Sequence, residues 1–189
     1  MVSRATRRKK SATYADLEAL PEHLVGELID GELVASPRPS LRHARSASRL
    51  SMGLGGPFDR GIDGPGGWII LNEPELHLDP HVLVPDLAGW RRERMPELPD
   101  TAGTSLPPDW VCEVLSPSTE ADDRAAKMPI YAAFGVAHLW LLDPLLQTLE
   151  VFRLQGSDWL LVGTHKGQRI VRAEPFDAVE LDLGTLWER

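Results

Sequence analysis

The segments VLVPDLA (residues 82–88) and WVCEVL (residues 110–115) are short apolar runs that each hold one carboxylate, Asp86 in the first and Glu113 in the second. Runs of this kind, rich in β-branched residues and bounded by proline or turn residues, are typical of buried strands in a sheet. A carboxylate inside a buried strand is costly unless a metal ion or a cationic side chain compensates it. We therefore expect Asp86 and Glu113 to lie on neighbouring strands and to form a functional site.

The chemistry of that pair favours a divalent cation. Two carboxylates from adjacent strands can bind one Mg²⁺ or Mn²⁺ and leave coordination positions for water and for a phosphate oxygen. Such a cation lowers the pKa of the bound water and offsets the negative charge that develops on the phosphate. Lys127, in an expected helix at 121–134, is the candidate to orient the water or the phosphate. The pattern predicts hydrolysis of phosphodiester bonds.

Each of these residues also has a purely structural interpretation. Asp86 directly follows Pro85, so its alternative is a turn residue at the end of a strand. The alternative for Glu113 is a buried ion pair. The alternative for Lys127 is an ion pair with Asp123, four residues earlier on the same helix.

The composition restricts the class of protein. The chain has 189 residues, 42% hydrophobic and 25% charged, as expected of one globular domain with a sizeable core. Its single cysteine, Cys112, excludes an internal disulfide framework and a zinc site built from several cysteines. No run approaches the roughly 20 apolar residues that cross a bilayer, and the N-terminus lacks the apolar core of a secretory signal. We expect a cytoplasmic protein without membrane association.

The charge distribution gives a mixed indication for nucleic-acid binding. The net charge is −8, whereas proteins that bind nucleic acid usually carry a basic surface. Residues 1–10 nevertheless contain five basic and no acidic side chains. We expect residues 1–12 to form a basic flexible tail, either simply solvated or in contact with phosphates, and residues 13–189 to form a single domain.

The pattern of expected elements is that of a mixed α/β (α+β) protein. The segment ELIDGELV (residues 27–34) predicts a β-hairpin with a tight Asp-Gly turn. Ser40 is expected to cap a helix that runs to about residue 54, and Gly53 to Gly67 is expected to be a loop.

Further along, strands are expected at about 68–78 and 82–90, before the strand that holds Glu113. The helix at 121–134 contains Pro129, which is expected to kink or restart it.

A set of acidic, basic and aromatic positions follows one serial order along the chain: ELIDGEL (27–33), His43, Pro85-Asp86, Glu113 with VLSPST (114–119), Asp123, Lys127, Tyr131 and HLWLLDP (138–144). This order, which covers about residues 13–154, resembles the Uma-type restriction endonuclease family of the PD-(D/E)xK nuclease superfamily. The resemblance implies a restriction-endonuclease-like fold, in which helices flank a mixed central β-sheet. It also implies a divalent metal, Mg²⁺ or Mn²⁺, DNA as the substrate, and a homodimer.

Carried over to this chain, the resemblance makes Asp86 and Glu113 the metal ligands, Lys127 the catalytic cation and Glu27 a candidate further acid. Other side chains are candidates for contact with the substrate, each with a capping or solvated-surface role as its alternative: His43, Arg42, Arg45 and Ser116.

The chain departs from the superfamily pattern at Leu115, where a lysine is expected two residues after Glu113. The ammonium must then come from Lys127, 14 residues after Glu113. Three functions stay open. They are a Mg²⁺-dependent DNA endonuclease, a degenerate nuclease-fold protein that binds nucleic acid without catalysis, and a dimeric regulatory module.

Overall fold

The computed structural model describes residues 11–188, so most of the predicted basic tail (1–12) lies outside the described residues. The largest sheet is mixed and has six strands in the order β11-β10-β9-β8-β6-β3, with β8 and β9 parallel and the other neighbours antiparallel. The strands are β3 (Trp68–Asn72), β6 (Leu87–Arg91), β8 (Trp110–Val114), β9 (His138–Asp143), β10 (Thr148–Gln155) and β11 (Asp158–Lys166).

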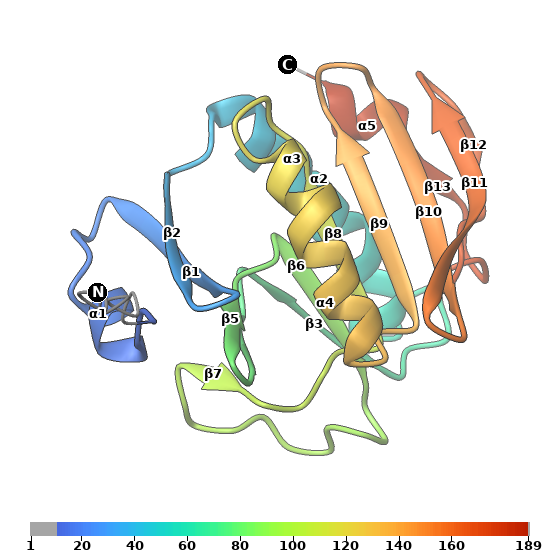
Figure 1. Ribbon diagram of the computed structural model, residues 1–189. Helices are drawn as coiled ribbons and strands as arrows, with labels where there is room; N and C mark the ends of the chain where they lie inside the picture. Colours follow the sequence, from blue (N-terminus) through green and yellow to red (C-terminus); the bar gives the residue numbers. More distant parts are fainter. Residues whose placement is uncertain (1–10, 189) are drawn as a thin grey trace, which may run out of the picture.

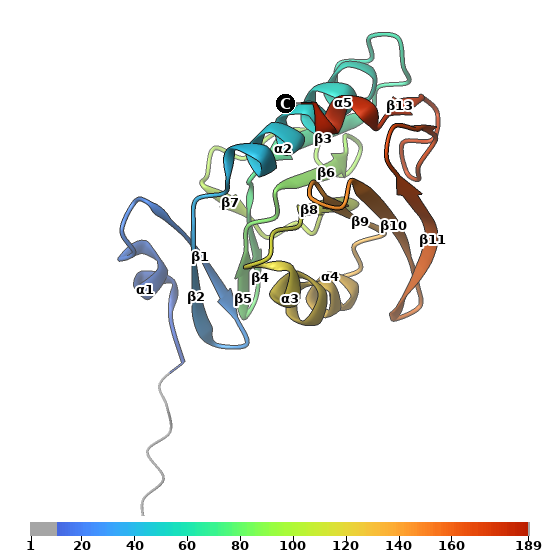
Figure 2. The same cartoon turned by 90° about the horizontal axis from the view of Figure 1, so that it is seen from above.

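Helices cover both faces of this sheet (Figures 1 and 2). One face carries α2, and the other carries a continuous helical run that passes from α3 through a π-helical segment into α4. The helical elements are α2 (Leu41–Leu54) with its π-helical extension η1 (Gly55–Asp59), and α3 (Glu120–Asp122), η2 (Asp123–Lys127) and α4 (Met128–Ala133).

The alternation of side chains along β8 fits these two layers. Trp110 and Val114 join the buried cluster on the α2 side, whereas Val111 and Leu115 join the cluster under α4. Successive side chains of a strand point to opposite faces. Glu113 therefore points to the same side as Val111 and Leu115, towards the α3–α4 helix.

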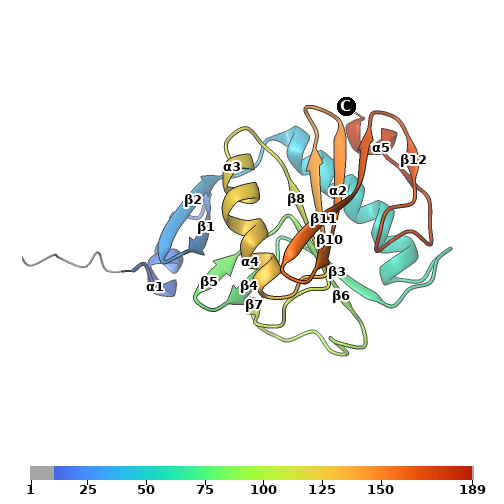
Figure 3. The ribbon, with the colours of Figure 1, turned by 45° about the vertical axis from the view of Figure 1, so that its right-hand side comes forward.

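A second, five-stranded sheet stands beside the first in the order β2-β1-β5-β4-β7, and its β1–β2 hairpin lies next to the α3–α4 helix (Figure 3). The turn of this hairpin has positive φ at both Asp30 (51°) and Gly31 (76°), the backbone that an Asp-Gly hairpin turn requires. The elements here are α1 (Tyr14–Glu18), β1 (Leu24–Ile29), β2 (Glu32–Pro37), β4 (Glu75–Leu78), β5 (His81–Leu83) and β7 (Gly103–Thr104).

The C-terminal segment closes the α2 side of the molecule. The Ser46 hydroxyl on α2 donates a 2.8 Å hydrogen bond to the carbonyl of Leu186, which attaches α5 to α2. Phe176 packs against the rings of Trp110 and Trp140, with centroid distances of 4.9 and 5.6 Å. The elements are β12 (Ile170–Val171), β13 (Leu181–Asp182) and α5 (Gly184–Trp187).

The expected fold class, a mixed sheet flanked by helices, is confirmed, but three local expectations change. The segment 82–90 is not one strand, because Pro85 has no N–H to donate and the chain leaves β5 there and enters β6 of the other sheet. The segment 68–78 likewise divides at Glu73, which has a φ of 48°. The expected loop after Gly53 is helical as far as Asp59.

The expected disturbance of the helix at Pro129 takes the form of a change from the π-helical segment η2 to α4, in whose first turn this residue lies. The helical run is not interrupted, since Lys127 and Met128 keep helical backbone angles. Among residues 11–188, the structure has no helix long and apolar enough to cross a membrane.

Candidate active site

Three carboxylates from three different elements surround one ammonium group. The Nζ atom of Lys127 lies 3.0 Å from Oε1 of Glu27 on β1, 3.5 Å from Oε1 of Glu113 on β8 and 3.1 Å from Oδ1 of Asp123 on η2. The exposed fractions of these side chains are only 8% for Lys127, 10% for Glu27, 2% for Glu113 and 3% for Asp123. The interactions are therefore only weakly screened by water.

The charges of this cluster are unbalanced, because one ammonium cannot offset three carboxylates. Burial raises the pKa of Glu113 well above its usual value against the attraction of Lys127, and repulsion from the neighbouring acids adds to this rise. Burial likewise raises the pKa of Glu27 and of Asp123, although Lys127 opposes both shifts. For Lys127, burial disfavours the charged form, but the three carboxylates outweigh it and raise its pKa well above the usual value.

Hydrogen bonds fix the orientation of two of these carboxylates. The buried Tyr131 hydroxyl on α4 donates a 2.6 Å hydrogen bond to Oε1 of Glu113. The backbone N–H of Val84 donates to Oε1 of Glu27 at 2.8 Å. Both oxygens also face Lys127, so each carboxylate is held in one orientation from two sides.

Asp86 lies in the bend before β6, not inside a buried strand as expected. The strand that follows it, β6, is nevertheless the neighbour of β8, and the N–H of Val114 donates to Oδ2 of Asp86 at 2.8 Å. Oδ1 lies 2.5 Å from Nε2 of His43, on the first turn of α2. The side chains of Asp86 and His43 are 15% and 11% exposed, so this pair lies at the margin of the buried site.

A cavity of about 270 Å³ joins the cluster to the Asp86–His43 pair. Five carboxylates line it, against two cationic side chains, Arg38 and Lys127. Ser116 also lines the cavity, as expected, with its hydroxyl 3.0 Å from those of Ser118 and Thr119. The acidic side chains of the lining are Glu27, Glu73, Asp86, Glu113 and Asp123.

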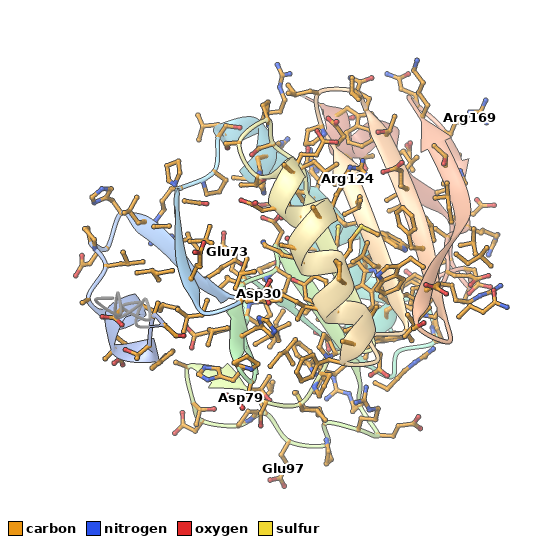
Figure 4. All side chains as sticks on the ribbon, viewed as in Figure 1. Asp30, Glu73, Asp79, Glu97, Arg124 and Arg169 are labelled. Atoms are coloured by element: carbon orange, nitrogen blue, oxygen red, sulfur yellow. The ribbon has the colours of Figure 1, made fainter. Side chains whose placement is uncertain are left out.

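The structure separates other predicted residues from this cavity. Arg42 and Arg45, expected to contact the substrate there, are exposed and line a different cavity between α2 and α5. Figure 4 shows Arg124 on the side of the α3–α4 helix that faces β9 and β10, whereas Glu73 lies on the other side, towards the β1–β2 hairpin. Arg124 pairs there with Glu150 of β10 at 2.6 Å, away from the cluster.

Sequence reasoning missed part of the site. Asp123 belongs to the serial order that carries the resemblance and is the alternative ion-pair partner of Lys127, but it is not among the predicted site residues, although its i,i+4 spacing to Lys127 places both side chains on one helical face. Tyr131 belongs to the serial order that carries the resemblance, but its contact with Glu113 was not predicted, and Glu73 carried no signal, because both places depend on contacts between distant segments.

The chemistry of the lining suits the divalent cation that the resemblance implies. Mg²⁺ prefers carboxylate oxygens, and the excess of acids over bases in the cavity favours an added positive charge. Within residues 11–188, however, no three acidic, histidine or cysteine side chains are already arranged to hold a metal ion. Asp86 and Glu113 would supply the two protein ligands, although Glu113, like Glu27 and Asp123, already faces the Lys127 ammonium.

One solved structure is similar over nearly its whole length. It is the crystal structure of a protein from Anabaena variabilis, described as a putative nuclease belonging to DUF820, with a TM-score of 0.71 and 22% sequence identity. The likeness covers 93% of this chain and 97% of that chain, and at this identity it concerns the fold. No curated protein matches the sequence.

A family model matches residues 11–184. Its description is "Putative restriction endonuclease", and the match includes all the residues of the cavity. A match of this extent shows that the chain belongs to the Uma2 family, and this membership supports a nuclease function.

Proposed function

We propose that the protein is a Mg²⁺- or Mn²⁺-dependent endonuclease that hydrolyses phosphodiester bonds of DNA. The observation that carries this proposal is the placement of a buried lysine among Glu27, Glu113 and Asp123, at a cavity that Asp86 also lines. An acidic cavity repels the phosphates of DNA unless a cation neutralises it. A nuclease with this lining therefore needs a metal.

Asp86 and Glu113 would hold the metal, which when bound supplies an activated water and offsets negative charge on the phosphate. Val114 N–H and His43 fix the Asp86 carboxylate from two sides, and Tyr131 fixes Glu113. Such supporting contacts keep metal ligands in the orientation that binding requires.

Lys127 would orient the attacking water or the phosphate, in the role that Leu115 cannot take. Leu115 is 4% exposed and belongs to the apolar cluster under α4, so no ammonium reaches the site from β8. Lys127 approaches the same carboxylate, Glu113, from the helix that covers this face of the sheet. Its raised pKa keeps it charged at neutral pH.

A second candidate function is binding of nucleic acid without catalysis. It is favoured by the ion pairs of Lys127, which already occupy three of the acids, and by the lack of a ready metal cage among the described residues. In such a protein the cluster would be a structural ion-pair network. The homodimer implied by the resemblance remains a prediction for either function.

The test is metal-dependent cleavage of plasmid and single-stranded DNA by the purified protein and by three near-isosteric variants, Asp86→Asn, Glu113→Gln and Lys127→Met. Glu97→Gln is the matched control, because Glu97 is exposed and lies at the opposite end of the molecule from α3 (Figure 4). We expect cleavage with Mg²⁺ or Mn²⁺ in the wild type and the control, and at least about a hundredfold loss in the three variants. Cleavage that survives in both carboxylate variants would sink the proposal, and an inactive but folded wild type would favour the second candidate.

A further inference from the structure

Arg42 and Arg45 belong to a cavity of about 460 Å³ between the first half of α2, α5 and the β9–β10 turn, which we call the α2–α5 pocket. Volumes of this size accommodate small organic ligands. The lining combines cationic, aromatic, apolar and amide side chains. The residues that matter here are Leu41, Arg42, Arg45, Leu145, Trp187 and Glu188.

The two arginines are available for an anion. Both are exposed, and neither guanidinium group forms an ion pair or hydrogen bond with another residue of the described part of the chain. Three residues apart on α2, they lie on one side of the helix. The acid in the pocket does not neutralise them, because Glu188 is paired with Arg49 at 3.3 Å.

The pocket also offers an apolar platform beside this charge. Trp187 is half-buried, and its ring nitrogen donates to the carbonyl of Gly167 at 3.1 Å, which holds the indole in place. Leu41 and Leu145 are 92% and 54% exposed. Aromatic and apolar surface next to unpaired guanidinium groups is the combination that binds an unstacked nucleobase together with its phosphate.

The pocket and the carboxylate cavity share one helix. Ser40 and His43 of the first turn of α2 line the cavity, whereas Arg42 and Arg45 line the pocket. The two sites are therefore separated by about one helix diameter, roughly 10 Å. A nucleic-acid strand covers this distance in a few nucleotide steps, at about 3.4 Å of rise per step in a duplex strand.

We propose that the α2–α5 pocket binds an unpaired nucleotide of the strand whose scissile phosphate lies at the carboxylate cavity. Arg42 and Arg45 contact phosphates, and the base lies in the pocket against Trp187. This inference rests on the proposed function and specifies its substrate class. Because a base inside the pocket cannot be paired, the substrate is single-stranded where it leaves the active site.

The test is binding of a short fluorescent thymidine oligonucleotide, measured by anisotropy in EDTA. No cleavage takes part there, and the affinity reports contacts at the α2–α5 pocket, because the metal-free carboxylate cavity repels phosphates. The variants are Arg42→Gln/Arg45→Gln, which changes only exposed charge, and Trp187→Leu. The matched control is Arg60→Gln, because Arg60 is also exposed and without an ion pair among the described residues, but follows η1 at the opposite end of the α2 helix.

We expect the double variant to bind more weakly and to lower the slope of log affinity against log salt by about 1.4, since each phosphate contact to a single strand contributes about 0.7. Trp187→Leu should weaken binding at least about fivefold with little change in slope, the lower end of what stacking of one base contributes. Arg60→Gln should match the wild type, and a fully paired duplex of equal length should bind more weakly than the single strand.

An unchanged affinity and salt slope in the double variant would overturn the inference, even if Trp187→Leu fails to fold. Duplex binding as tight as single-strand binding would also overturn it, as would an effect of the double variant on self-association alone. If the wild type cleaves nothing but its oligonucleotide binding still depends on both arginines, the proposed function fails and the pocket assignment stands.

Discussion

Lys127 and Glu27 form an ion pair of 3.0 Å between the helix that covers the large sheet and the β1–β2 hairpin of the small one. The pair closes one side of the cavity, because both residues line it. Glu27 is held at the same time by the N–H of Val84, between β5 and β6. The candidate site therefore exists only where the two sheets meet.

Removal of Lys127 should destabilise the fold strongly. Lys127→Ala leaves three buried carboxylates without their cation, and breaking a buried ion pair in this way costs about 3–5 kcal/mol. Arg124→Ala, three residues earlier on the same helix, removes partly exposed pairs with Glu120 and Glu150 and should cost no more than about 1 kcal/mol. Urea unfolding in EDTA measures both values, and equal losses in the two variants would contradict the buried cluster.

The stability of the metal-free protein should depend on pH through Glu113. Its pKa is raised in the folded state, so the folded protein holds this proton more tightly than the unfolded chain, where the pKa is about 4.3. The resulting stability is fully present below the unfolded pKa and is lost as pH rises through the raised folded pKa. Glu113→Gln cannot ionise, so in EDTA the stability of the wild type relative to this variant should fall as the pH rises. Melting temperatures of both proteins between pH 4 and pH 8 measure this difference, and parallel curves would show that Glu113 ionises normally.

Tyr131 should affect metal affinity more than fold. Tyr131→Phe removes the hydroxyl that holds Oε1 of Glu113, and loss of such a supporting contact costs about 10–100-fold in metal affinity. The only other tyrosine supplies a matched control, since Tyr14 donates to Glu75, which is not in the cavity lining. Calorimetric titration with Mn²⁺ should show weaker binding for Tyr131→Phe and unchanged binding for Tyr14→Phe. Equal affinities in all three proteins would remove Glu113 from the metal site.

Metal should stabilise the folded protein by mass action. A ligand that binds only the native state adds about 2.7 kcal/mol at a concentration a hundred times its Kd. Thermal unfolding with increasing Mg²⁺ should therefore raise the Tm of the wild type, and Asp86→Asn should abolish most of this increase. A Tm that responds to Mg²⁺ equally in both proteins would place the bound ion elsewhere on the surface.

Much of the local structure was predictable because it depends on neighbours in the sequence. The Asp30-Gly31 turn and the Ser40 cap with its bond from the N–H of His43 are confirmed, and the helix is disturbed next to Pro129, where η2 changes to α4. The strand around Asp86 was the main exception. Pro85 predicts a turn next to Asp86. The sequence does not show that the chain changes there from one sheet to the other, because this change depends on distant strands.

The predicted substrate contacts on α2 line two different cavities, which local sequence does not determine. Arg42 and Arg45, predicted to contact the substrate, are three residues apart in the sequence, and both are exposed on α2. Helical periodicity says which residues share a face, but not what that face meets. The packing of α5 on α2 decided that these arginines line the α2–α5 pocket, while His43, next to Arg42 in the sequence, faces the carboxylate cavity.

The hairpin, the Ser40 cap and the fact that Glu113 shares a face of β8 with Val111 and Leu115 all follow from the sequence, because successive side chains of a strand alternate between its two faces. The contacts of Glu113 depend on packing, because the opposite face of β8 is buried as well. Its ammonium partner comes from a covering helix, the hydroxyl that orients it comes from Tyr131, and the further acid Glu27 comes from another sheet. Such contacts join segments far apart in the chain, and burial of the two sheets against the helix, not any local pattern, brings them within hydrogen-bonding distance.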